Sequence, residues 1–202
     1  MSIRTRRPSA DTISVTEFAD PSTRTLLAGD GTTTLLLEAI LRAPVTVRVR
    51  EQHLQDAEEL PPEIGRALQL PPQCRVLVRE SMLITPDEQP VSYNRAIITT
   101  EPGNPLYPLI DDRHTPLGRA LLAAAIEQHR QILTTGHRHW PFSAEFRAAA
   151  AKTYLIHMDG RPRLHLTETY SPDLFPADLE PAVCTSAGAI GAASNHTQED
   201  NL

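Results

Sequence analysis

The chain has 202 residues, of which 40% are hydrophobic and 22% are charged, and its net charge is −6. This length suits one domain with a sizeable core, and the composition is that of an ordinary globular protein rather than a disordered or fibrous one. The acidic balance and the low share of aromatic residues, 4%, argue against nucleic-acid binding, which needs a basic surface and rings on which bases stack.

No stretch of the sequence approaches the roughly twenty apolar residues that a membrane-spanning helix requires. The basic residues near the N-terminus precede no apolar block, so they do not form a secretory signal. The two cysteines, Cys74 and Cys184, are too few and too isolated for a disulfide framework or a thiolate metal site. We therefore expect a cytoplasmic protein with reduced thiols and without a nucleic-acid or membrane partner.

Composition divides the chain into three regions. Residues 1–16 are polar, basic at first, and are predicted to form a flexible arm. Residues 173–202 combine Pro, Ala, Gly, Ser and acidic residues without an apolar period, which predicts a largely disordered tail. The folded domain is therefore expected over residues 17–172.

The first elements of this domain are short. Apolar residues predict helical segments at 26–27 and 35–41, on either side of a Gly-Asp-Gly turn. Valines at alternate positions of 45–49 have the period of a half-buried strand. A further short helix is predicted at 62–68.

Two antiparallel hairpins are predicted farther along the chain. In the first, segments 75–84 and 90–100 are rich in Val, Leu and Ile and flank a short turn with Pro and Asp. The second joins 153–158 to 163–170 through an Asp-Gly turn, which is typical of a tight hairpin.

The longest helix is predicted to begin between these hairpins. Thr115 has the character of an N-cap and Pro116 that of a first helical residue. An apolar face would follow, formed by Leu117, Leu121, Ala125 and Ile132. An alanine run at 148–151 favours helix locally and leaves the start of the next strand open. Antiparallel strands interrupted by segregated helices make an α+β domain.

Familiar nucleotide-binding, serine-hydrolase and zinc-protease motifs are absent from the sequence. His137 and His139 could supply two metal ligands, but alternate histidines in a Gly-flanked polar loop are more typical of a solvated segment. We therefore expect no metal site.

Two charged residues stand inside otherwise apolar strands. Arg79 lies in the first hairpin and Glu168 near the end of the second. Charged side chains are rarely buried unless they are paired. Simple alternation would place both on the solvent-facing side of the sheet. The alternative is that both face a buried binding site.

The predicted start of the long helix adds a third element. Backbone N–H groups at Leu117 and Gly118 would be free, and such a helix end attracts anions. Gly118 would also let a ligand approach the backbone closely. The simpler interpretation is an ordinary capped helix.

Taken together, these segments resemble the chorismate pyruvate-lyases that make 4-hydroxybenzoate. The resemblance extends from about Leu26 to Pro172, and the order and spacing of its anchors carry it. The anchors are Leu26-Leu27 to Thr34, Val47 to Glu51, Arg79-Glu80, Thr115-Pro116-Leu117-Gly118-Arg119 and Leu166-Thr167-Glu168.

The resemblance implies a highly curved antiparallel sheet with helices on one side, enclosing a ligand cavity. It implies that Arg79 binds the ring carboxylate, that the Leu117 N–H adds a donor and that Glu168 meets the ring hydroxyl. Arg79 and Glu168 would be catalytic, and the substrate-binding set would be Thr32, Arg79, Leu117, Gly118 and Glu168. Well-known family members have methionine where this chain has Thr32.

The implied activity is a cofactor-free elimination that splits chorismate into 4-hydroxybenzoate and pyruvate, with no partner other than the small-molecule substrate. Two alternatives stay open. One is a non-catalytic domain like the effector-sensing domains of bacterial transcription regulators, although residues 1–16 are too few for the DNA-binding unit of such regulators. The other is a natural-product cyclase acting on a different acid. The oligomeric state, monomer or dimer, is also open.

Overall fold

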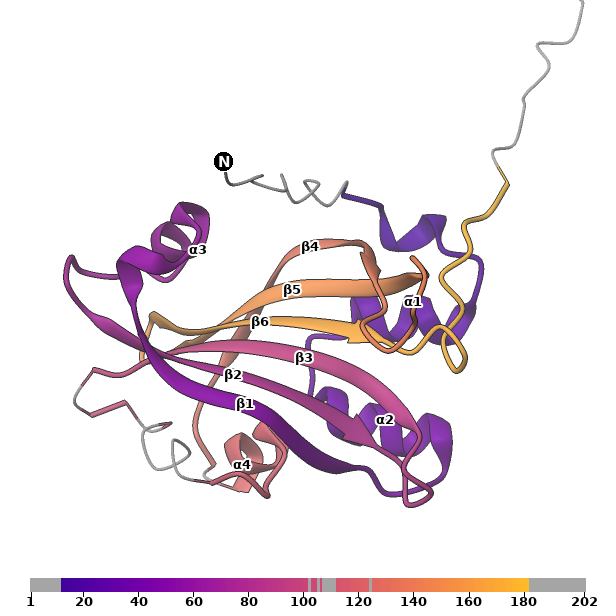
Figure 1. Cartoon of the computed structure of the whole chain (residues 1–202), viewed down its shortest axis with the longest axis horizontal. Coiled ribbons are helices and arrows are strands. Elements are labelled where there is room, and N and C mark those ends of the chain that lie inside the picture. The colour runs from indigo at the N-terminus through magenta and orange to yellow at the C-terminus, as the bar shows by residue number, and fades with distance from the viewer. Residues whose placement is uncertain (1–11, 102, 105, 107–111, 124, 182–202) are drawn as a thin grey trace, which may run out of the picture.

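The computed structural model describes residues 12–101, 103, 104, 106, 112–123 and 125–181 (Figure 1). Its centre is a six-stranded sheet in the order β1-β2-β3-β6-β5-β4, in which every neighbouring pair is antiparallel. The strands are β1 (Thr46–Asp56), β2 (Arg75–Ile84), β3 (Pro90–Thr99), β4 (His129–His139), β5 (Ala148–Met158) and β6 (Arg161–Tyr170). The sheet bends strongly along its length, so one face is concave (Figure 1).

Both predicted hairpins are confirmed: β2 pairs with β3, and β5 with β6. The second turn contains Asp159 and Gly160, both with positive φ, as a tight hairpin turn requires. The alanine run 148–151 is strand rather than helix, because it pairs with β4 along one edge. The packing of a central strand outweighs the local helix preference of alanine.

The helices are short and lie mainly on the concave side. They are α1 (Pro21–Ala28), α2 (Thr33–Leu41), α3 (Pro62–Ala67) and α4 (Leu117–Ala123), with 3-10 turns at Val15–Glu17 and Ala57–Glu59. Asp20 caps α1 by accepting a hydrogen bond from the backbone N–H of Thr23, and Pro21 occupies its first position. The helix α3 departs from the expected one-sided arrangement and packs on the opposite face of the sheet.

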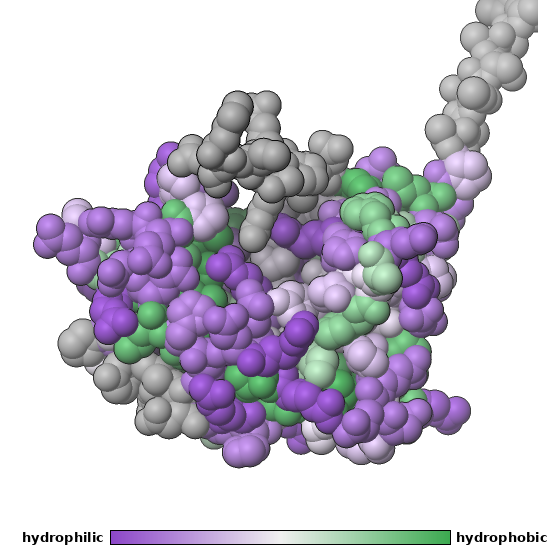
Figure 2. Space-filling model, viewed as in Figure 1, coloured by the Kyte–Doolittle hydropathy of each residue, from purple (hydrophilic) through white to green (hydrophobic). Residues whose placement is uncertain are grey.

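Alternation along β2 explains how both faces are covered. Leu77 packs with the cluster on the concave side, whereas Val76 and Val78 pack with Ile64 of α3 on the other side. Successive residues of a strand point to opposite faces, so a strand covered on both sides is apolar throughout. On the outer surface in view, hydrophilic residues predominate and apolar residues form small separate areas (Figure 2).

The long helix predicted from Thr115 to Ile132 is wrong. The helix α4 ends at Ala123, Ala125 has a φ of 48°, and the chain then enters β4. Ile132 pairs with Tyr154 of β5 instead of continuing a helical face. Residues 136–139, predicted as a loop, are the end of the same strand. Because β5 is buried on both faces, the backbone N–H and C=O groups along its edge need hydrogen-bond partners. Pairing with β4 supplies them, and residues 129–139 therefore form a strand.

The packed part of the described chain extends beyond the limits predicted at residues 17 and 172. Phe175 and Ala177 are buried in the core near α1. Ile13 donates a backbone hydrogen bond to Thr135 of β4, and Phe18 forms a bridge with Leu179. The rest of the predicted arm and tail, including Cys184, lies outside the described residues.

Cys74 is a free thiol. No described helix has the length and apolar character needed to cross a membrane.

Candidate functional site

A hollow on the concave face lies between the sheet and the starts of α2 and α4. Its cavity volume is about 40 Å³, and the figure rises to about 540 Å³ when all space between the atoms, open solvent included, is counted. The wall is largely apolar, with side chains such as Leu121, Ile156 and Leu166. The charged residues on this wall are Arg79, Arg130 and Glu168. A mainly apolar hollow with a few convergent charges is typical of a small-molecule site.

Strand register places Arg79 and Glu168 on the same face of the sheet. Arg79 of β2 lies opposite Ala96 of β3, and Glu168 of β6 lies opposite Asn94, two residues away. Paired residues share a face and so do residues two apart. Both charged side chains are buried, at 2% and 5% exposure. The expectation from alternation alone, that both face solvent, is therefore wrong.

Main-chain carbonyls hold the guanidinium of Arg79. Its Nη1 donates to the carbonyl of Asp112 at 2.8 Å, and its Nη2 to that of Thr115 at 3.2 Å. The Asp112 carboxylate shapes this loop by accepting the backbone N–H groups of His114 and Thr115. No carboxylate among the described residues lies within 4.0 Å of Arg79. Burial lowers the pKa of Arg79 and the nearby Asp112 carboxylate raises it, but a guanidinium stays charged, so the wall carries a cation without a direct ion pair among the described residues.

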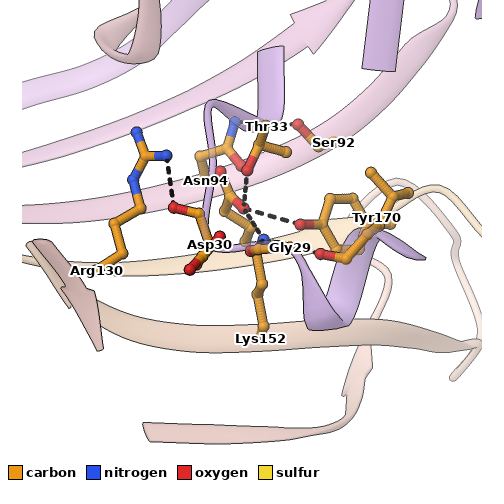
Figure 3. Close-up of polar contacts among 10 residues, drawn as sticks. Gly29, Asp30, Thr33, Ser92, Asn94, Arg130, Lys152 and Tyr170 are labelled. Carbon is orange, nitrogen blue, oxygen red and sulfur yellow. Dashed lines mark hydrogen bonds and ion pairs between the residues drawn. The ribbon is translucent and has the colours of Figure 1, made fainter. Parts of the chain in front are cut away.

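One oxygen of Glu168 receives three polar partners. Its Oε2 accepts hydrogen bonds from the Thr33 hydroxyl at 2.9 Å and the Tyr170 hydroxyl at 2.8 Å, and the Lys152 ammonium lies 3.6 Å away. Figure 3 shows Thr33, Lys152 and Tyr170 converging from α2, β5 and the end of β6. Burial raises the pKa of Tyr170 well above its ordinary value, so its proton stays available for donation. All three contacts involve Oε2, and the Tyr154 hydroxyl also interacts with the carboxylate.

Lys152 connects this carboxylate to the end of α1. Its ammonium donates to the carbonyls of Leu26 at 2.8 Å and Gly29 at 2.9 Å. Burial lowers the pKa of Lys152, and the charge of Glu168 raises it. The lysine therefore fixes the position of Glu168 against the turn that precedes α2.

Two polar atoms near the wall are buried without a hydrogen-bond partner among the described residues. They are Nε of Arg130 and Oδ1 of Asn94, and both residues line the hollow. Unpartnered buried polar atoms are uncommon in proteins, and such an atom beside a cavity calls for an explanation such as an ordered water or a bound ligand. The site thus has unused capacity for a polar ligand.

The start of α4 forms another part of the wall, although it differs from the expectation. Leu117 and Gly118 line the hollow. However, α4 has only seven residues, and its first backbone hydrogen bonds are accepted by the carbonyl of Pro116 rather than that of Thr115. A Cβ atom on Gly118 would lie 3.0 Å from Cγ2 of Thr32 and 3.1 Å from Oγ1 of Thr34. Gly118 therefore allows α4 to approach α2 closely.

Four of the five predicted site residues meet around this hollow: Arg79, Leu117, Gly118 and Glu168. Thr32 is not among the residues that line it; it precedes α2, and the next two residues, Thr33 and Thr34, line the hollow instead.

Sequence reasoning missed Arg130, Lys152 and Tyr170. Lys152 carries the same signal as Arg79, a charge inside an apolar strand, and follows directly on the alanine run of β5. That signal was hidden because the strand was predicted only from residue 153 and the alanine run before it left its start open. For Arg130 the sequence offers no such signal, since it starts a strand with polar neighbours.

Among the described residues, no group of three His, Cys, Asp or Glu side chains could hold a metal ion. Nε2 of His137 lies 2.6 Å from the carbonyl of Ala177, a contact that ties β4 to the segment after β6. His139 stacks on Phe146. Neither histidine is among the residues that line the hollow.

Comparison with known proteins supplies a family and a fold. A family model described as "Chorismate pyruvate-lyase Rv2949c-like" matches residues 27–177. The effector domain of PhnF from Mycobacterium smegmatis is similar with a TM-score of 0.55 and 16% identity, over 72% of this chain and 91% of that one. The structure of PhnF from the same organism is similar with a TM-score of 0.56 and 16% identity, and the match covers 73% of this chain and 67% of that one. No curated protein matches the sequence. The expected α+β fold, a curved antiparallel sheet around a cavity, is confirmed.

Proposed function

Because the chain belongs to the Rv2949c-like chorismate pyruvate-lyase family, we propose that it converts chorismate into 4-hydroxybenzoate and pyruvate without a cofactor, in the cytoplasm. One observation carries the proposal: the buried Arg79 cation and the buried Glu168 carboxylate line the same small hollow. A ring acid with a carboxylate at one end and a hydroxyl at the other complements such a pair.

Arg79 binds the ring carboxylate in this proposal. Two of its five N–H donors are used by carbonyls, and the other three have no hydrogen-bond partner among the described residues and are assigned to the ligand. The carbonyls of Asp112 and Thr115 hold the planar group in one orientation, which favours bidentate recognition of a carboxylate. At the other end, Oε1 of Glu168 accepts the ring hydroxyl while Oε2 stays anchored to Thr33 and Tyr170.

The reaction itself needs little chemistry from the protein. The bond between ring C3 and the ether oxygen breaks, the hydrogen on C4 moves to the methylene carbon of the leaving group, and the C4–H electron pair completes the aromatic ring. The products are 4-hydroxybenzoate and pyruvate, and no water, electron or metal is consumed. The site contributes by folding and orienting the substrate, with Arg79 stabilising charge and Glu168 holding the hydroxyl.

The decisive experiment is incubation of the purified protein with chorismate, with 4-hydroxybenzoate and pyruvate measured together. We expect the two products in equal amounts. Arg79→Ala and Glu168→Gln should each reduce turnover by about 100-fold or more. Arg161→Ala removes an exposed charge at the start of β6 and should leave turnover unchanged. Near-normal pyruvate release by either site variant would contradict the assigned roles.

A second candidate function is ligand binding without turnover. The similarity to the effector domain of PhnF favours it at the level of the fold. In that case the protein would bind chorismate or a related acid tightly and release no pyruvate. Calorimetric titration performed beside the product assay separates the two functions.

A further inference from the structure

We propose that Arg130 binds the second carboxylate of chorismate, the one on the enolpyruvyl group that leaves as pyruvate. The inference rests on the proposed function and adds a residue that distinguishes substrate from product. Chorismate carries two carboxylates, whereas 4-hydroxybenzoate keeps only the one on the ring. A site for the dianion therefore needs a second anion-binding group besides Arg79.

Strand pairing brings Arg130 to the hollow. Arg130 of β4 lies opposite Ile156 of β5, and both residues line the wall. The strands β3, β6 and β5 separate β4 from β2, which carries Arg79. The curvature of the sheet lets residues of both strands line one hollow (Figure 1). The two arginines therefore reach the ligand from opposite sides.

The guanidinium of Arg130 has donors to spare. Its Nη1 donates to the carbonyl of Asp30 at 3.1 Å, and Nε is buried without a partner among the described residues. No described carboxylate lies within 4.0 Å of it. A cation with unused donors beside a cavity provides an attractive site for an anion, because charge-assisted hydrogen bonds are the strong ones.

The charges around the hollow match a dianion. Arg79 and Arg130 are the cations on its wall, and Glu168 is the anion. Lys152, 3.6 Å behind Glu168, offsets that negative charge. The residues that line the hollow therefore carry an excess of positive charge even though Asp112 partly offsets Arg79, and a ligand with two carboxylates neutralises more of it than a ligand with one.

The position of Arg130 along the hollow selects the leaving carboxylate rather than the ring carboxylate. Lys152, which holds Glu168, donates to the carbonyl of Gly29, and Arg130 donates to the carbonyl of the next residue, Asp30. Both side chains thus hold the same turn, as Figure 3 shows. The enolpyruvyl ether is attached to the ring carbon next to the one that bears the hydroxyl. With the hydroxyl at Glu168, that group points toward the Arg130 side of the hollow.

The test compares substrate and product binding in Arg130→Ala, Arg130→Lys and the control Arg161→Ala. Steady-state kinetics give KM for chorismate, product inhibition gives Ki for 4-hydroxybenzoate, and calorimetry gives Kd for both ligands where turnover is absent. Loss of a charge-assisted contact should raise KM or Kd for chorismate roughly 10- to 100-fold. The Ki for 4-hydroxybenzoate should change less than about twofold, and Arg130→Lys should recover part of the loss. The control should match wild type.

Other outcomes separate this inference from the proposed function. If wild type releases pyruvate and Arg130→Ala weakens both ligands equally, or neither, the role of Arg130 is overturned while the function stands. If wild type binds chorismate without turnover, the function fails and the ratio of the two Kd values still decides the role of Arg130. Absence of chorismate binding to wild type overturns both. An unchanged Ki for the product also shows that Arg130→Ala is folded.

Discussion

The ammonium group of Lys152 lies 3.6 Å from Oε2 of Glu168, and the two side chains are 2% and 7% exposed. The same ammonium donates to the carbonyls of Leu26 and Gly29, so one buried cation joins the end of α1 to the carboxylate. A buried charge requires a partner of opposite sign, because the interior of a protein solvates it poorly. The contributions of Lys152 and Glu168 to the free energy of unfolding are therefore expected to depend on each other.

Replacing Lys152 with methionine should lower the free energy of unfolding by about 3–5 kcal/mol, because it leaves Glu168 as an unpaired buried charge. Urea unfolding measures the change. The control Arg161→Met removes an exposed cation and should stay within about 0.5 kcal/mol of wild type. Adding Glu168→Gln to Lys152→Met should restore part of the loss; strictly additive costs would show that the two groups are independent.

Two glycine substitutions in helices should have opposite effects. Gly118→Ala in α4 places a Cβ 3.0 Å from Cγ2 of Thr32, so α4 has to move away from α2 at a cost of about 1–3 kcal/mol. Gly65→Ala in α3 meets no atom within 4 Å and should stabilise the protein by about 0.5–1 kcal/mol. Thermal and urea unfolding of both variants check the signs. Stabilisation by both would mean that the contact between α4 and α2 is loose.

Asp112 should make stability depend on acidic pH. Hydrogen bonding with Thr115 is the main reason that its pKa falls from 3.8 to about 2. A carboxylate with a lowered folded-state pKa stabilises the fold above its unfolded pKa, and this stabilisation is lost as pH falls through the folded value. Asp112→Asn should therefore be less stable than wild type near neutral pH, and the difference should shrink between about pH 4 and about pH 2. Unfolding midpoints across that range measure it, and a constant difference would argue against the titration of Asp112.

The segment after β6 should contribute to folding. Phe175 is fully buried among the residues near α1, so Phe175→Ala should cost about 3–5 kcal/mol. Phe146 provides a matched control, because it is 75% exposed and its replacement by alanine should cost about 0.5 kcal/mol or less. Equal unfolding midpoints for the two variants would place Phe175 outside the core.

Local patterns determined a large part of the fold. Both hairpins follow from alternating or apolar runs around short turns. Asp159 and Gly160 have the positive φ values that a tight hairpin turn requires, and Asp-Gly is a sequence typical of such a turn. Local signals predicted α2 and α3 close to their observed bounds, but of α1 they predicted only residues 26–27. Arg79 and Glu168 also stood out in the sequence, since a charge within an apolar strand invites a structural or functional reason.

The strand β4 shows where local patterns fail. Residues 115–132 have the spacing of an amphipathic helix, yet the free edge of β5 takes residues 129–139 as its partner. Strand pairing joins residues far apart in the chain, so the local sequence of residues 115–132 does not show that the edge of β5 needs a partner. The placement of Phe175 in the core depends on tertiary contacts in the same way.

The sequence by itself therefore determined the fold class, the hairpins and the two charged residues Arg79 and Glu168. Only the tertiary structure decided that these two charges share one hollow, that Lys152 lies behind Glu168 and that Arg130 reaches the same wall from the far strand. The physical reason is that each of these relationships arises from strand register and sheet curvature, which bring distant residues together. A charge in a strand is visible in sequence, whereas its partner is set by the fold.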